Sequence, residues 1–248
     1  VHHVFVLRSD MLQYQEISDE LKLISPLAII ETVPSVTKGQ ACTALVGLKA
    51  LQSEIGSISG PITFGACDNG ALYDSKAFQL LADNPDIDVI VWGNCGHVNA
   101  VRNPQMFGWI NADNGRINEI SVKKPLNSPE TDPIAIGTFT FRDSEDFQRV
   151  VGNLITRDGR INGEFYIDSC INDAIKLGLC CHLFEVDNFI SWGTPNDLKT
   201  FEYWQSCFHK WNNHPYRLEL DKRVPKDMLN DLKERYQNKV HNLPGEFA

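Results

Sequence analysis

The sequence predicts one α/β domain built on an open, mostly parallel sheet with an antiparallel insertion. Strands and helix-length segments alternate through the first half of the chain, which is the pattern of right-handed βαβ crossovers. The segment DVIVWG, residues 88–93, is an apolar run of the kind buried on both faces of a parallel sheet. Asp113-Asn114-Gly115 lies between two strand-like runs and is the best short hairpin signal in the chain. The 248 residues, 42% of them hydrophobic, can bury a large core in a single domain.

The first half of the chain carries the repeating strand and helix units. Apolar runs bounded by turn residues mark the strands, and apolar residues at three- and four-residue spacing mark the helices. The elements expected there are strands at about 3–8, 27–33, 61–67 and 87–93, and helices over 14–24, from Thr37 to Ile55, and over 75–83.

The second half changes character. The hairpin insertion is expected at about 106–122, followed by a strand at 133–141 and a helix at 143–157. Thr194-Pro195 then starts a helix as N-cap and first helical residue. Its aromatic stripe is interpreted as core and consists of Phe201, Trp204, Phe208 and Trp211. We expect the α/β domain to span 1–215. A charged helical tail, 216–248, is expected to pack on the domain or on a second copy in a homo-oligomer.

Charge and composition exclude several classes of protein. The net charge is −9 and the pI is near 5.2, so the chain lacks the basic surface of a dedicated nucleic-acid binder. No apolar run approaches the roughly 18 residues of a membrane span. The seven cysteines never occur as C-x-x-C, which is typical of free thiols in a reducing compartment. We therefore expect a soluble, cytoplasmic protein that does not bind nucleic acid or membranes.

Asp68 is the first candidate site residue. It follows the strand ITFGAC directly, and open parallel sheets bind ligands beyond the carboxyl ends of their strands. A carboxylate there suits Mg²⁺, which bridges acids to substrate phosphates. The helix after Thr37 adds a positive dipole end that attracts anions. The competing interpretations are that Asp68 only caps a turn with Asn69, and that Gln40 only completes a capping box with Thr37.

Six segments in order resemble the sugar-1-phosphate nucleotidyltransferase family: TKGQACTAL, GACDNG, FGWINADNGRINEISVKKP, GTFTF, GEFYIDSCINDAI and WGTPNDL. The resemblance runs from about Val4 to Trp211. It implies the nucleotide-diphospho-sugar transferase fold, a Rossmann-like fold shared with many glycosyltransferases. It also implies an activity for nucleotide-sugar or surface-polysaccharide synthesis. In that reaction a sugar phosphate, or a similar acceptor, attacks the α-phosphorus of a nucleoside triphosphate and releases pyrophosphate.

The resemblance assigns roles to individual residues. Gly39, Gln40 and Asn69 match positions at the nucleotide, and Asp68 matches the acid that holds Mg²⁺ between the phosphates. At the acceptor end, Gly108 matches a glycine whose backbone lies against the sugar. Lys124 matches the lysine of a Glu-Lys-Pro motif that contacts the sugar phosphate, and Glu164 matches a glutamate that binds sugar hydroxyls. These roles suit in-line transfer at phosphorus, which depends mainly on positioning and charge neutralisation.

Three positions depart from the family pattern. The glycine-rich signature that handles the triphosphate is absent from the 248 residues, so we expect a fragment of a longer protein whose sheet has lost a central strand. Ser191 stands where many members have a second metal-binding Asp, and Asp187 is the nearby alternative. Lys123 stands where the family has Glu, which indicates a more anionic substrate or simply an exposed charge.

Two other functional classes stay open beside the nucleotidyltransferase. A glycosyltransferase of related fold would consume a nucleotide sugar, and a non-catalytic nucleotide-binding domain would do neither reaction. Because the phosphate-binding loop is absent, we expect this chain by itself to be inactive. Its affinity for a triphosphate should be no better than roughly millimolar.

Overall fold

The computed structural model describes residues 1–11, 14–213 and 218–232. The chain divides into two compact units, Val1–Ser191 and Trp192–Ala248, which are described separately. The boundary expected at residue 215 falls inside the second unit. No helix in the described part of the chain is long and apolar enough to cross a membrane.

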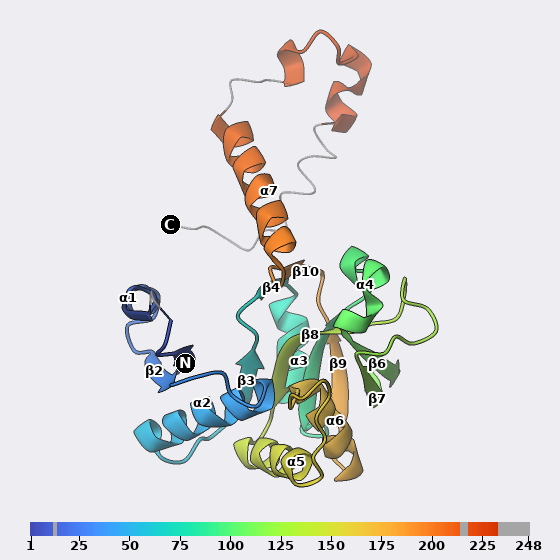
Figure 1. Ribbon diagram of the computed structural model, residues 1–248. Coiled ribbons are helices and arrows are strands. Elements are labelled where there is room, and N and C mark those ends of the chain that lie inside the picture. The colour runs from blue at the N-terminus through green and yellow to red at the C-terminus, as the bar shows by residue number, and fades with distance from the viewer. Residues whose placement is uncertain (12–13, 214–217, 233–248) are drawn as a thin grey trace. The chain divides into compact units, whose positions relative to one another are not determined.

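The first unit is built on a six-stranded mixed sheet (Figure 1). Its strand order is β3-β8-β5-β9-β7-β6. The bounds are Ile62–Gly65 for β3, Ile134–Phe141 for β8, Val89–Asn94 for β5, Cys181–Glu185 for β9, Arg116–Val122 for β7 and Gly108–Asp113 for β6. Only β5 and β9 pair in parallel within this sheet. The other pairings are antiparallel because β8 and the β6–β7 hairpin run against their neighbours.

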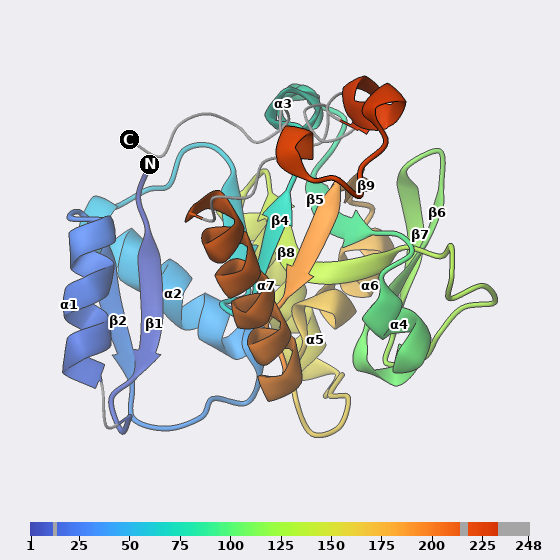
Figure 2. The same cartoon turned by 90° about the horizontal axis from the view of Figure 1, so that it is seen from above.

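Strand β5 shows how the core is divided. Its six residues are all buried, and successive side chains point to opposite faces. Val89 and Val91 face a core that also contains residues of α2 (Gln40–Ile55), α5 (Ser144–Thr156) and α6 (Ile167–Lys176). Ile90 and Trp92 face a smaller core covered by α3 (Ser75–Asp83). Helices α3 and α5 accordingly lie on opposite sides of the sheet in Figure 2.

Two further strands form a separate parallel pair. β1 (Val4–Arg8) pairs with β2 (Ile29–Val33), and neither is hydrogen-bonded to the six-stranded sheet. Helix α2 joins the two sheets, since Gly47 packs against the side chains of Val4 and Val6 while Leu48 belongs to the main core. β1, β2 and β3 each have one edge with no strand partner among the described residues. The β1–β2 pair and the six-stranded sheet are therefore separate sheets.

The remaining elements connect these layers. β4 (Asn69–Leu72) and β10 (Asn188–Ser191) form an antiparallel pair. The other helices are α1 (Tyr14–Ile24), α4 (Val98–Arg102), α7 (Pro195–Asn213) and three short 3-10 turns at Pro104–Met106, Leu218–Leu220 and Lys226–Met228. Asp74 caps α3 and Asp143 caps α5, each accepting hydrogen bonds from backbone nitrogens of the first turn.

The α/β class and the strand and helix positions of the first half are confirmed. The hairpin is confirmed too, with Asn114 and Gly115 at positive φ of 49° and 83°, as a tight turn of this kind requires. β4 was not predicted, because its four residues continue directly from the bend at Asp68. Among residues with described side chains, all the cysteines up to Cys207 are free.

One prediction about the second unit is wrong. Trp204 and Phe208 are 53% and 56% exposed, so these members of the aromatic stripe on α7 are not core residues. The side chain of Trp211 and most of the amphipathic tail helix lie outside the described residues.

Candidate functional site

Asp68 lies in the bend between β3 and β4 and is exposed. Its side chain makes no hydrogen bond or ion pair with any described residue. It therefore does not cap the turn with Asn69, which was the alternative to the interpretation of Asp68 as a metal-binding acid. The neighbouring Asn69 is anchored, since its Nδ2 donates to the carbonyl of Ile136 at 2.8 Å. The result is an unpaired carboxylate on a fixed backbone.

Gly39 occupies a position that only glycine can take. Its φ is 126°, and a Cβ there would lie 2.5 Å from the backbone nitrogen of Phe165. Two backbone hydrogen bonds flank Gly39 and join its segment to Phe165. Phe165 N donates to Lys38 O at 2.9 Å, and Ala41 N donates to Phe165 O at 3.0 Å. The start of α2 is thus fixed against the segment that carries Glu164.

Gln40 is the first residue of α2, and its side chain does not form the alternative capping box with Thr37. Its amide instead approaches Gly137 of β8. A Cβ at Gly137 would lie 4.0 Å from Gln40 Nε2 and 3.6 Å from Asn69 Nδ2. Two predicted nucleotide-binding residues, far apart in sequence, therefore meet beside one glycine. Gly137 itself was not predicted as a site residue, although a glycine inside a strand signals close approach of other groups.

Gly108 begins β6 and is covered by Asp168 of α6, whose carboxylate occupies the space that any side chain at position 108 would need. Sequence reasoning missed Asp168, and the signal available was its place in the motif GEFYID. Burial raises the pKa of Asp168 to about 6, and the nearby Lys123 opposes this rise. The site thus contains a carboxyl group that titrates near neutrality, a property common at functional sites.

The two candidate lysines are placed differently. Lys123 has a positive φ of 60°. Its Nζ donates to the carbonyl of Met106 and lies 5.4 Å from the centre of the Tyr166 ring. The side chain of Lys124 is exposed, and only its backbone oxygen is bonded, to Ser121 Oγ at 2.7 Å. Lys123, rather than Lys124, faces Tyr166 and Asp168.

Glu164 is exposed and lies at the end of the loop before α6. Burial first, and the Glu164 carboxylate second, raise the pKa of Tyr166. Because Glu164 precedes Phe165, it is adjacent to the contact with Gly39. The segment between the start of α2 and Gly108 therefore carries polar side chains at every second residue, namely Glu164, Tyr166 and Asp168.

The β4–β10 pairing places the two candidates for a second metal ligand at different distances from Asp68. Ser191 is paired with Asn69, next to Asp68, whereas the residue after Asp187 is paired with Leu72 at the other end of the ladder. Asp187 is thus more than roughly 10 Å along the strands from Asp68, given about 3.4 Å per residue. Among the described residues no group of three or more His, Cys, Asp or Glu side chains could hold a metal ion. A Mg²⁺ ion held by one carboxylate and substrate phosphates still fits Asp68.

Comparison with solved structures identifies the fold. The nucleoside-diphosphate-sugar pyrophosphorylase of Vibrio cholerae RC9 matches with a TM-score of 0.64 at 18% identity. The match covers 81% of this chain and 80% of that one. The inositol-1-phosphate CTP transferase of T. maritima gives a TM-score of 0.58 at 12% identity, over 84% of this chain and 77% of that one. The CTP:phosphocholine cytidylyltransferase of Streptococcus pneumoniae gives 0.52 at 14%, over 82% and 78%.

The chain has the nucleotide-diphospho-sugar transferase fold. The resemblance seen in the sequence is confirmed at this level, because structural neighbours across the chain are pyrophosphorylases and related nucleotidyltransferases. No family model and no curated protein matches the sequence itself. Within this fold, Gly39, Gln40, Asn69 and Gly137 form one group, and Gly108, Lys123, Tyr166 and Asp168 form the other.

Proposed function

We propose that the protein is a nucleotidyltransferase that acts on a sugar phosphate or a similar phosphorylated acceptor. An oxygen of the acceptor phosphate attacks the α-phosphorus of a nucleoside triphosphate. The new P–O bond forms as the bond from the α-phosphorus to the β-phosphate oxygen breaks, and pyrophosphate leaves. The product is the nucleoside monophosphate joined to the acceptor's own phosphate, as nucleotide-sugar or surface-polysaccharide synthesis requires.

The observation that carries this proposal is the meeting of Gln40 and Asn69 at Gly137, beside the Gly39–Phe165 contact. Amide side chains offer both donors and acceptors, which suits the edge of a nucleobase. Gly39 leaves its backbone exposed to close approach, and the N-terminus of α2 contributes a positive dipole end. We assign the nucleotide to this group.

The acceptor is assigned to the group around Gly108. Lys123 supplies a positive charge for the acceptor phosphate, in place of the Lys124 expected from the sequence. The carboxylates of Glu164 and Asp168 can accept hydrogen bonds from hydroxyl groups. Inositol phosphate, glucose phosphate and phosphocholine appear in the names of structural neighbours. All three are phosphorylated acceptors, which supports an acceptor of this class here.

Asp68 is the residue that would hold Mg²⁺, because its carboxylate is exposed and unpaired. The ion would neutralise phosphate charge in the transition state. Ser191 lies next to it across the β4–β10 pair and can contribute at most a weak neutral ligand or an ordered water. We assign Asp68 as the single protein carboxylate of this site.

Pyrophosphate release tests the proposal. The full-length protein is incubated with each nucleoside triphosphate, Mg²⁺ and a panel of sugar, polyol and choline phosphates. Pyrophosphate that depends on both substrates supports the nucleotidyltransferase. Release of nucleoside diphosphate from a nucleotide sugar, with no pyrophosphate from any pair, would identify a glycosyltransferase instead. If neither product forms, the protein is a nucleotide-binding domain without catalytic activity.

A further inference from the structure

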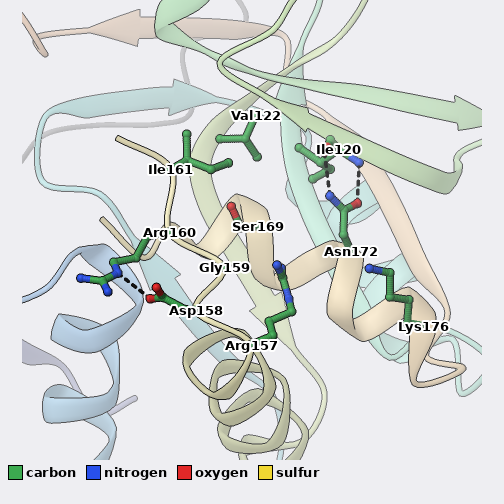
Figure 3. Close-up of a pocket in the computed structure, with 10 residues that line it drawn as sticks. All are labelled: Ile120, Val122, Arg157, Asp158, Gly159, Arg160, Ile161, Ser169, Asn172 and Lys176. Atoms are coloured by element: carbon green, nitrogen blue, oxygen red, sulfur yellow. Dashed lines mark hydrogen bonds and ion pairs between the residues drawn. The ribbon is translucent and has the colours of Figure 1, made fainter. Parts of the chain in front are cut away.

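A pocket lies outside the candidate site, between the loop after α5, helix α6 and strand β7 (Figure 3). Its volume is about 400 Å³, which is in the range of small-molecule sites. None of the candidate site residues lines it. Ile120, Val122 and Ile161 give it an apolar wall, and Arg157, Ser169 and Lys176 line the side formed by the loop and α6.

The charge in this pocket is positive on a protein whose net charge is −9. Of its ten lining residues, three are cations (Arg157, Arg160 and Lys176) and one, Asp158, is an acid. Arg160 is bonded to that acid at 2.6 Å and points away from α6 (Figure 3). Lys176 has no hydrogen bond or ion pair with any described residue. Lys176 is therefore the lining cation with no partner among the described residues.

Arg157 is held in place with part of its donor capacity unused. Its Nε and Nη2 bond the two carboxylate oxygens of Asp173 at 2.8 and 2.7 Å. The remaining nitrogen, Nη1, lies over Gly159, which also lines the pocket. Asp173 thus fixes the guanidinium, and Nη1 stays available as a charged donor.

Ser169 is the independent sign of a ligand. The residue is 4% exposed and lines the pocket, yet its hydroxyl has no hydrogen-bond partner in the protein. A buried hydroxyl left unpaired costs about 1–3 kcal/mol, and such groups in native proteins need an explanation. An acceptor bound in the pocket would satisfy it.

The pocket is also preformed. Asn172 donates to Ile120 O at 2.8 Å and accepts from Ile120 N at 2.9 Å, which locks α6 to β7. Both ends of its amide are engaged by these bonds, so we assign Asn172 to building the pocket and not to binding the ligand.

We propose that this pocket binds a phosphomonoester, with its phosphate on Arg157, Lys176 and Ser169 and its body against Ile120, Val122 and Ile161. A phosphomonoester carries about −1.5 to −2 charges at neutral pH and three strong acceptor oxygens. These match two cationic donors and one hydroxyl donor. This site is separate from the proposed nucleotide and acceptor groups and does not depend on them.

Calorimetric titration with glucose 6-phosphate, inorganic phosphate and glucose tests the proposal. We expect a saturable site for glucose 6-phosphate that depends on Ser169 and Lys176, weaker binding of inorganic phosphate and none of glucose. Ser169→Ala should weaken glucose 6-phosphate binding about tenfold to a hundredfold, the effect of one hydrogen bond to a charged group. Lys176→Gln should weaken it about tenfold at low salt, with a smaller effect at high salt.

Lys49→Gln serves as the control. It removes the same charge from an exposed position on α2 and should leave binding unchanged. In the absence of ligand, Ser169→Ala should melt at or above the wild-type temperature, because it removes an unpaired buried hydroxyl. Wild-type-like binding by both pocket variants would overturn the assignment. So would the lack of saturation below about 10 mM, or equal affinity for inorganic phosphate.

Discussion

At the scale of single residues, the site depends on what certain positions exclude. Gly39 and Gly108 are each covered by another segment at the place where a side chain would project, Phe165 in one case and Asp168 in the other. Asp68 shows the opposite condition, since its exposed carboxylate makes no hydrogen bond or ion pair with any described residue. These differences lead to three predictions.

Replacing Gly39 with alanine should destabilise the protein strongly. The new Cβ would lie 2.5 Å from Phe165 N at a φ of 126°, so strain and steric overlap add, and we expect a loss of about 3 kcal/mol or more. Gly178→Ala is the matched control, because its φ is also positive, at 84°, but no atom lies within 4 Å of the new Cβ. It should cost about 1 kcal/mol. Urea denaturation measures both, and equal losses would show that the Phe165 contact is unimportant.

In the full-length protein, Asp68→Asn should abolish most activity without causing unfolding. The exposed carboxylate has no protein partner, so stability should change by less than about 0.5 kcal/mol. The charge needed by a hard cation is lost, and turnover should fall by orders of magnitude in the pyrophosphate assay. Asp86→Asn, an equally exposed acid before β5, should keep full activity. An unaltered rate in the Asp68 variant would remove it from the metal site.

Asp168 should make stability depend on pH. Its pKa is 3.8 in the unfolded chain and about 6 in the fold. The folded state therefore holds the proton more tightly, and the resulting stabilisation is present below pH 4 and lost as the pH rises through 6. Asp168→Asn should be more stable than wild type by about 1–2 kcal/mol at pH 8, with the difference shrinking toward pH 4. Urea denaturation across this range measures it. A constant difference would contradict the raised pKa.

At the scale of elements, polar side chains fix the loop after α5 and helix α6 to the sheet. Asn172 bonds both backbone groups of Ile120 in β7, and Arg157 bonds Asp173 within α6. The sequence predicted α5, and the segment that forms α6 is one of those that resemble the family. The sequence did not predict this ion pair. Residues 157 and 173 are sixteen positions apart, and neither helical periodicity nor spacing links them.

Removing this ion pair should be costly. In Arg157–Asp173 the acid side chain is only 5% exposed, whereas in Arg160–Asp158 it is 63% exposed. Asp173→Asn leaves a guanidinium without its charged partner in a half-buried place, and we expect a loss of about 2–3 kcal/mol. Asp158→Asn removes the same kind of charge at the surface and should cost less than about 0.5 kcal/mol. Thermal denaturation of the two variants compares them, and similar losses would refute the role of burial.

At the scale of the whole molecule, the main architectural feature is that the β1–β2 pair is separate from the six-stranded sheet. The first unit has a fully buried strand, β5, at the centre of its larger sheet, while β1 and β2 form a pair that is only partly buried. The pair is joined to the larger sheet through α2 and not through a hydrogen-bonded ladder. The two sheets should therefore differ in local stability.

Hydrogen exchange should show this difference directly. Amides that bond within the β1–β2 pair, such as Ile29 N to His3 O and Ser9 N to Val33 O, should exchange at least tenfold faster than those of Val89 and Val91 in β5. Elements with few buried apolar contacts open with less free energy than the core. The measurement is native-state exchange followed by NMR or mass spectrometry. Equal protection in both sheets would mean that they unfold as one unit.

The sequence by itself determined the class of fold and the order of the main elements, and it predicted most of the residues that we assign to the candidate site. These follow from local patterns: apolar periodicity, helix caps, the Asp113-Asn114-Gly115 turn, and motifs whose order along the chain is preserved. It also identified Asp68 and the Gly39 loop, since a strand end and a helix start are readable from a few neighbouring residues.

The tertiary structure alone decided which side chains face one another. It showed that Lys123 rather than Lys124 faces the acceptor group, and that Asp187 lies too far along β10 to join Asp68. It also brought Gly137 and Asp168 next to candidate site residues, and it left Trp204 and Phe208 of α7 exposed. Such facts depend on strand register and on packing between segments distant in sequence. A shift of one residue turns a side chain to the opposite face, and a local pattern does not record that choice.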